Sequence, residues 1–173
     1  MKIILLSAIT WLLAMSSAAA EQTVEEDKPL EKELVGWIEK VHLTPGNITL
    51  DAKLDTGADN CSLNAENIKK FKRDGQSWVR FDIRNRLRET KTIELPVHKK
   101  TRIKRVKGKS QVRPVVRLGL CLAGKFSEVD VNLADRSNFS YPLLVGRSFL
   151  SAHVILDPAR TYMSEPGCPA KEK

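Results

Sequence analysis

Apolar and polar residues alternate along much of this chain, which is the pattern of half-buried β-strands. The clearest alternation lies in residues 78–84 and 126–133. Further strand candidates cover residues 35–41, 48–54, 93–97, 114–122 and 154–156, and turn clusters such as Thr44-Pro45-Gly46-Asn47 separate them. Because Pro96 lacks a backbone N–H, we expect residues 93–97 at a sheet edge. Seven or more short strands predict an all-β barrel or sandwich with minor helix.

Two short segments depart from this alternation. Ala65, Ile68 and Phe71 recur at helical spacing, so we expect a short helix over residues 64–71 that stops near Asp74-Gly75. Residues 148–152 are long enough for one further helical turn. The expected fold class is therefore all-β with minor α.

The N-terminal residues have the composition of a secretory signal. Lys2 precedes an apolar stretch over residues 3–15, and small residues end at Ala18-Ala19-Ala20. We expect a cleavable signal peptide over residues 1–20 and a periplasmic or secreted protein, with a retained membrane anchor as the alternative. An acidic, flexible leader would follow over residues 21–33, then one domain over residues 34–165 and a C-terminal tail over residues 166–173.

Three cysteines form no pattern of a zinc cluster or a disulfide framework. At most one bridge can form within a chain, and a bridge between Cys121 and Cys168 is conceivable in an exported protein. Cys61 follows closely on the segment 54–59, and we expect it to be a buried thiol.

Positive charge gathers in one region of the chain. The formal net charge is +8, and residues 99–117 contain nine lysines and arginines and no acidic residue. Such a segment is typical of a projecting hairpin, either as a solvated face or as a surface for anionic partners. For an exported protein we expect acidic polypeptides or anionic envelope surfaces and no nucleic acid.

The segment Leu54-Asp55-Thr56-Gly57-Ala58-Asp59 follows the strand 48–54 and is the strongest candidate for chemistry. An aspartate in such a loop activates water when a second carboxylate lies close by, because the pair then holds one proton between its members. One carboxylate acts as base toward water and the other donates to the carbonyl oxygen. Asp55 is therefore the candidate catalytic residue, and it is half of a dyad.

The neighbours of Asp55 fit such a loop. Gly57 permits a tight turn and a close approach, and the Thr56 hydroxyl is able to cross to a facing loop. Ala58 carries no hydroxyl that would stabilise the ionised carboxylate, so it favours action nearer neutral pH. Gly146-Arg147, after the apolar run 143–145, is the segment expected to brace the loop.

These two segments resemble the retroviral-type aspartic proteases. More closely, the chain resembles the bacterial retropepsin-like aspartic peptidase family that carries the label "ATP-dependent zinc protease". The matching segments are residues 35–37, 53–58, 74–81, 113–116, 133–136 and 141–147.

The resemblance implies a retropepsin-like closed β-barrel with one short helix after Gly146-Arg147. It implies a homodimer in which each chain supplies one Asp55, although Asp135 or Asp157 of the same chain is an alternative second acid. The basic hairpin would lie where a flap covers the substrate, with Lys104, Arg105 and Lys107 as its substrate contacts. An acidic substrate agrees with the association of this family with glutamate-ligase-type enzymes.

The family label itself finds no support in the residues. His42, His98 and His153 are scattered singly, without the spacing of zinc ligands. Gly108-Lys109-Ser110 resembles the end of a nucleotide-binding loop, but Ile103 occupies the position of its first glycine. We therefore expect no metal and no cofactor.

Three hypotheses follow from the sequence. The first is an exported aspartic endopeptidase that hydrolyses an envelope peptide or protein. The second is a non-catalytic module that binds a peptide or regulates an envelope or inner-membrane protein. The third is a basic protein that adheres to anionic envelope material.

Overall fold

The computed structural model describes residues 31–103 and 110–168. The predicted signal peptide, most of the leader, the end of the tail, and Lys104, Arg105 and Lys107 lie outside the described residues. The described strands are β1 (Glu33–Thr44), β2 (Ile48–Leu54), β3 (Cys61–Asn64), β4 (Glu66–Arg73), β5 (Gln76–Arg84), β6 (Thr90–Pro96), β7 (Lys99–Ile103), β8 (Gln111–Leu122), β9 (Lys125–Ala134), β10 (Leu143–Val145) and β11 (Val154–Thr161), and the helix is α1 (Arg147–His153).

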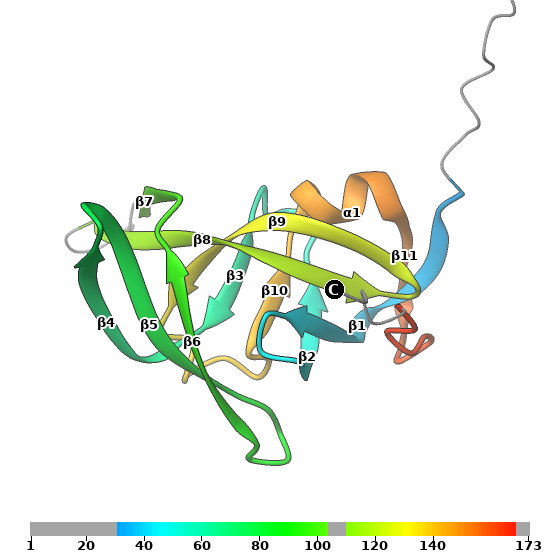
Figure 1. Cartoon of the computed structure of the whole chain (residues 1–173). Helices are drawn as coiled ribbons and strands as arrows, with labels where there is room; N and C mark the ends of the chain where they lie inside the picture. The colour runs from blue at the N-terminus through cyan, green and yellow to red at the C-terminus, as the bar shows by residue number, and fades with distance from the viewer. Residues whose placement is uncertain (1–30, 104–109, 169–173) are drawn as a thin grey trace, which may run out of the picture.

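Six of these strands close into a barrel. They pair in the order β1-β2-β10-β3-β9-β8, and β8 returns to β1 through pairs such as His42 with Cys121. β11 adds in parallel to the outside of β1, and β7 extends the sheet beyond β8 (Figure 1). The predicted all-β class, with a closed barrel and one short helix after Gly146-Arg147, is confirmed.

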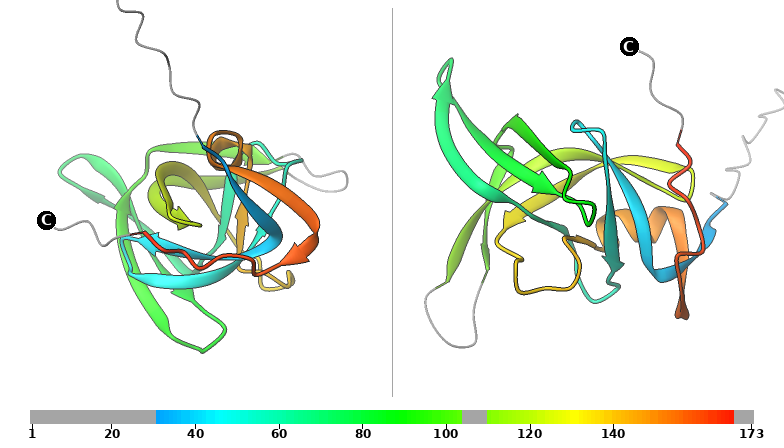
Figure 2. Two further views of the ribbon diagram at one scale, coloured as in Figure 1. Left: turned by 90° about the vertical axis from the view of Figure 1, so that its right-hand side faces the viewer. Right: turned by 90° about the horizontal axis from the view of Figure 1, so that it is seen from below.

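A second sheet of three strands, β4-β5-β6, stands at one end of the barrel, while α1 and β11 lie toward the other end (Figure 2). Its inner face is apolar because the alternation in β5 directs Val79, Phe81 and Ile83 inward, and all three are fully buried. These side chains join the barrel interior in one core. β6 is an edge strand, as Pro96 predicts.

The helix predicted over residues 64–71 is wrong, because most of this segment is strand β4, paired with β5. Phe71 faces Trp78 on one side of the sheet, whereas Ile68 packs against the core on the other side. A regular strand places residues three apart on opposite faces. The apolar residues at helical spacing therefore pack on the two faces of one strand.

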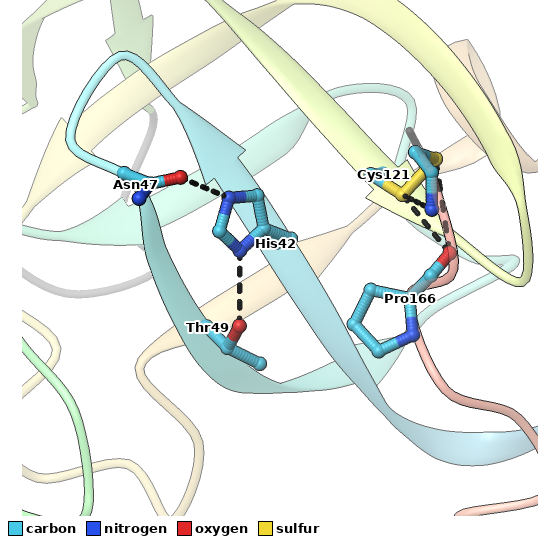
Figure 3. The surroundings of a disulfide bond; sticks show 6 residues. His42, Asn47, Thr49, Cys121 and Pro166 are labelled. Atoms are coloured by element: carbon cyan, nitrogen blue, oxygen red, sulfur yellow. Dashed lines mark hydrogen bonds between the residues drawn. A yellow bond between two sulfur atoms is a disulfide. The ribbon is translucent and has the colours of Figure 1, made fainter. Parts of the chain in front are cut away.

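Two further features differ from or complete the sequence expectations. The last strand does not stop before Asp157-Pro158 but continues to Thr161, and Asp157 accepts a hydrogen bond from the Ala159 N–H at 2.8 Å. Cys121 and Cys168 form a disulfide that ties the C-terminal segment to the end of β8 (Figure 3). Cys61 is a free, buried thiol, as predicted.

Among residues 31–103 and 110–168, no helix is long and apolar enough to cross a bilayer. The same residues contain no cluster of three or more histidine, cysteine or acidic side chains suited to a metal ion.

Candidate active site

Asp55 is positioned by main-chain pairing at the end of β2. β10 runs parallel beside β2, with Val145 opposite Leu54, and the Asp55 N–H donates to the Val145 carbonyl at 2.9 Å. The Asp55 side chain is half-buried, and its Oδ1 accepts the Gly57 N–H at 3.0 Å. Gly57 is the one hydrogen-bond donor to this carboxylate among the described residues. The carboxylate is therefore oriented but far from saturated with hydrogen bonds.

Gly57 is needed for space rather than for an unusual backbone angle. A Cβ atom at this position would lie 3.2 Å from Asp55 Oδ1, and the Gly57 φ angle is not in the left-handed region. A side chain there would crowd the carboxylate that the Gly57 N–H holds. Thr56 is exposed beside it, and the next residue, Ala58, is half-buried.

Gly146 and Arg147 lie directly against this loop. A Cβ atom on Gly146 would come within 2.7 Å of the Asn60 carbonyl oxygen and 2.8 Å of the Ala58 carbonyl oxygen, so the two backbones meet more closely than any side chain allows. The Arg147 N–H donates to the Ala58 carbonyl at 2.8 Å.

The guanidinium of Arg147 holds the same loop at two more points. Nη1 donates to the Thr56 carbonyl oxygen at 2.7 Å, and Nη2 contacts the Asp59 carboxylate. One arginine thus connects the residues on both sides of Gly57, which restrains the loop from its base.

Cys61 closes the base of the loop from the interior. Its Sγ accepts the Gly146 N–H at 3.5 Å and lies 3.8 Å from Ser148 Oγ. Burial raises the pKa of the Cys61 thiol, and the hydrogen bonds from Gly146 and Ser148 oppose this only in part. The thiol is therefore neutral at physiological pH and packs as a small apolar group.

A cavity of about 310 Å³ opens next to the loop. Ala58, Asp59 and Asn60 form one of its walls, directly after the Asp-Thr-Gly residues. The opposite wall comes from β7 and β8, where Thr101 and Arg113 contribute. The paired strands β7 and β8 form the described part of the basic hairpin, so this hairpin borders the same cavity as residues 58–60.

The structure brings Asp55, Thr56, Gly57, Ala58, Gly146 and Arg147 together, whereas the hydrogen bonds of Asp135 among the described residues go to Ser137 and not to this loop. Asp135 follows β9, is exposed, and accepts hydrogen bonds from the hydroxyl of Ser137 at 2.6 Å and from its N–H at 3.0 Å. These bonds lower the pKa of Asp135, the hydroxyl contributing most. Asp135 therefore stabilises its own turn.

Sequence reasoning did not find Arg136 as a functional residue. Its side chain is 8% exposed and lines the cavity. The segment 133–136 was visible only as part of a family resemblance, because an arginine in a polar loop gives no local signal of burial.

Comparisons with known proteins agree with the loop and the barrel. Residues 34–166 match the model of the RimB-like family, described as "Retropepsin-like aspartic endopeptidase RimB". A crystal structure of a Legionella pneumophila protein of unknown function has a TM-score of 0.67 and 34% identity, covering 78% of this chain and 100% of that one.

The curated relatives are larger proteins that are named as ligases and not as endopeptidases. A Desulfotalea psychrophila protein named "Probable alpha-L-glutamate ligase" is 34% identical over 113 residues, which are 64% of this chain and 24% of that protein. A Shewanella pealeana protein of the same name is 33% identical over 116 residues, 65% of this chain and 25% of that protein. The chain thus spans about a quarter of the length of the curated relatives it matches.

Proposed function

Because the chain belongs to the retropepsin-like aspartic endopeptidase family, we propose that it is an exported aspartic endopeptidase in which Asp55 from two chains forms the dyad. The observation that carries the proposal is the state of the Asp55 carboxylate. It is held in place by backbone groups, is partly accessible, and accepts one hydrogen bond from the described residues next to a cavity. A carboxylate in this state is able to exchange a proton with water.

The surroundings of Asp55 support a dyad formed between chains. The other carboxylates near the loop and the cavity each have a partner: Asp59 contacts Arg147, Asp130 Oδ2 lies 2.6 Å from Lys99 Nζ, and Asp135 bonds to Ser137. Of their oxygens, Asp130 Oδ1 accepts no hydrogen bond from the described residues. Two-fold symmetry brings the same residue of a second chain to the axis. The exposed Thr56 would then be able to bond across to the facing loop.

The chemistry follows from two carboxylates that share one proton. The ionised member removes a proton from water, and the oxygen of this water attacks the peptide carbonyl carbon while the protonated member donates to the carbonyl oxygen. The protonated member then donates to the amide nitrogen while the ionised member takes a proton from a hydroxyl of the tetrahedral intermediate. The carbon–nitrogen bond breaks, and the dyad again holds one shared proton. The two apparent pKa values of such a pair belong to the dyad as a unit.

The cavity favours an acidic peptide or protein as substrate. Its lining carries three cations, Lys99, Arg113 and Arg136, against the two carboxylates of Asp59 and Asp130. Export is supported by the signal-like composition of residues 1–20 and by the Cys121–Cys168 disulfide, since disulfides persist in oxidising compartments. We place the substrate in the bacterial envelope for the same reasons.

A mixing experiment tests the dyad. When wild-type protein is refolded with a ninefold excess of Asp55→Asn protein, most wild-type chains pair with an inactive partner, so peptidase activity per wild-type chain falls about tenfold. Asp135→Asn protein alone keeps its activity. If activity per wild-type chain is independent of the Asp55→Asn excess, the inter-chain dyad is wrong. If Asp135→Asn abolishes activity, the second acid comes from the same chain.

The basic hairpin is tested separately. We expect charge reversal at Lys104, Arg105 and Lys107 to slow cleavage of acidic peptides while neutral peptides are little affected. If proteolysis is unchanged and only binding to anionic envelope material is lost, the hairpin serves adhesion.

A second function is favoured by the curated relatives. This kind of domain occupies about a quarter of proteins named as ligases, so in them it is joined to other parts of the chain. The alternative is therefore a non-catalytic module that uses the same cavity to bind a peptide of an envelope or inner-membrane protein and to regulate that protein. A strictly monomeric wild-type protein that binds peptides without cleaving them would support this alternative.

A further inference from the structure

The charges that line the cavity do not balance. The Asp59 carboxylate contacts Arg147 below the loop, and Asp130 Oδ2 lies 2.6 Å from Lys99 Nζ. Each carboxylate of the lining thus forms an ion pair, although Asp130 Oδ1 accepts no hydrogen bond from the described residues. Arg113 and Arg136 are the other two cations of the lining.

Arg136 has an unusual position for a permanently charged group. The residue is 8% exposed, its backbone N–H donates to Asn64 Oδ1 at 2.6 Å, and its guanidinium carbon lies 4.4 Å from the centre of the Phe139 ring. The backbone bond holds the main chain, and the ring packs against the guanidinium. Among the described residues no carboxylate forms an ion pair with Arg136, and its Nε has no hydrogen-bond partner. A buried guanidinium with an unused donor is costly unless a ligand satisfies it.

Arg113 adds a second positive charge to the same space. Its Nη1 donates to Asn132 Oδ1 at 3.2 Å and its Nε to Gln111 Oε1 at 3.0 Å, so the guanidinium is held on the wall of the cavity. Burial and, second, the charge of Arg113 lower the pKa of Arg136, while Asp55 raises it. The Arg136 guanidinium therefore interacts electrostatically with both Arg113 and the candidate catalytic residue Asp55.

We propose that Arg136, assisted by Arg113, binds a carboxylate of the peptide in this cavity and thereby sets the position of the peptide relative to Asp55. A planar carboxylate matches the fork of a guanidinium, and it would relieve the repulsion between the two arginines. The carboxylate belongs either to an acidic side chain or to the C-terminus of the peptide. The role as a substrate subsite rests on the proposed function, whereas the binding of a carboxylate does not.

Three probes separate the two sources of the carboxylate. The acetylated pentapeptide Ala-Ala-Glu-Ala-Ala with an amidated C-terminus carries only a side-chain carboxylate, and all-alanine pentapeptide with a free C-terminus carries only a terminal one. The Gln version of the first peptide, also amidated, carries neither. Binding is measured by NMR titration with the full chain carrying Asp55→Asn, so that no peptide is cleaved.

We expect one of the carboxylate probes to bind about 10- to 100-fold more tightly than the Gln peptide, the range of a charge-assisted hydrogen bond to a buried group. Arg136→Met removes this preference and Arg136→Lys retains part of it. Arg80→Met, at an exposed position of β5 away from the cavity, leaves the preference unchanged. Equal affinity for all three peptides, or no binding of either carboxylate probe at millimolar concentration, overturns the proposal. So does a folded Arg136→Met protein that keeps the preference.

If Arg136→Met fails to fold, Arg113→Met takes its place and is expected to weaken the preference for the carboxylate probe. The comparison of the three peptides on the Asp55→Asn protein does not depend on either arginine variant. The outcome is distinguishable from a failure of the proposed function. If the protein binds a carboxylate probe but the wild type has no peptidase activity, the subsite is supported and the endopeptidase proposal is wrong. If the wild type is active but no probe shows a carboxylate preference, the endopeptidase proposal is supported and the subsite is wrong.

Discussion

Glu39 in β1 and Asp55 at the end of β2 are carboxylates on neighbouring strands with opposite surroundings. Glu39 is fully buried, and its two oxygens accept four hydrogen bonds: from the Gly36 N–H at 2.7 Å, the Met163 N–H at 2.8 Å, the Ser164 N–H at 3.1 Å and the Ser164 hydroxyl at 3.2 Å. Asp55 is half-buried and accepts one from the described residues.

The difference separates a structural carboxylate from a chemical one. The Glu39 oxygens accept hydrogen bonds mainly from the C-terminal segment and so connect this segment to β1. No acceptor site remains for a substrate or for water. Asp55 is held by its own backbone and by the residues packed under its loop, so its carboxylate oxygens keep most of their capacity. Acid-to-amide substitutions at the two positions should therefore have opposite consequences.

The largest effect is expected for Asp55→Asn. Loss of the dyad removes general acid–base catalysis, so we expect peptidase activity to fall by at least about 1,000-fold. The free energy of unfolding should change by less than about 0.5 kcal/mol, because this partly exposed side chain accepts only the Gly57 N–H among the described residues. Peptide cleavage assays and urea unfolding check the two numbers. Unchanged activity would remove the endopeptidase proposal.

Glu39→Gln is the matched substitution in the other region. The amide nitrogen would face donors that now bond to a carboxylate oxygen, and the remaining bonds lose their charge, so the free energy of unfolding should fall by about 2–4 kcal/mol. Specific activity of the folded protein should stay within about twofold of wild type. Urea unfolding with an activity assay below the transition measures both. A stability equal to wild type would show that the C-terminal segment is not held by this carboxylate.

The Cys121–Cys168 disulfide ties down the same C-terminal segment as Glu39, so the two should be coupled. Cys121→Ser with Cys168→Ser is expected to lower the free energy of unfolding by about 2–3 kcal/mol with activity retained. Combined with Glu39→Gln, the loss should be smaller than the sum of the separate losses, because each change releases residues that the other also restrains. Strict additivity in urea unfolding would mean that the two anchors act independently.

Gly146→Ala tests the support under Asp55 and should lower the free energy of unfolding by about 2 kcal/mol, since a Cβ atom there must displace the Asn60 and Ala58 carbonyls. Because this displacement moves the Asp55 loop, activity should fall more than stability explains. Gly75→Ala is the control: it lies in the turn between β4 and β5 with a φ of +75°, has open space around it, and should cost about 1 kcal/mol without loss of activity. Equal activities of the two variants would contradict the role of Gly146.

Much of the fold could be predicted because strand alternation is a local property. The residues of β2, β5 and β9 alternate clearly, and the helix after Gly146-Arg147 was expected at its observed place. The helix prediction for the segment of β4 failed because Ile68 and Phe71 pack on opposite faces of one strand. The pattern of a single segment does not say whether one face or both faces of a strand will pack against other residues. The position of Asp55 after a strand was likewise readable, since the loop directly continues β2.

The sequence by itself determined most of the long strands, the Asp-Thr-Gly loop with its distant Gly-Arg segment, and the few pairings open to three cysteines. Only the tertiary structure decided that Glu39 is buried and saturated, that Arg147 binds Asp59, and that Arg136 lines the cavity beside the loop. These contacts join residues far apart in the chain, for example Glu39 with Ser164. Closing the barrel sets which distant side chains meet, and no local pattern of apolar and polar residues contains that information.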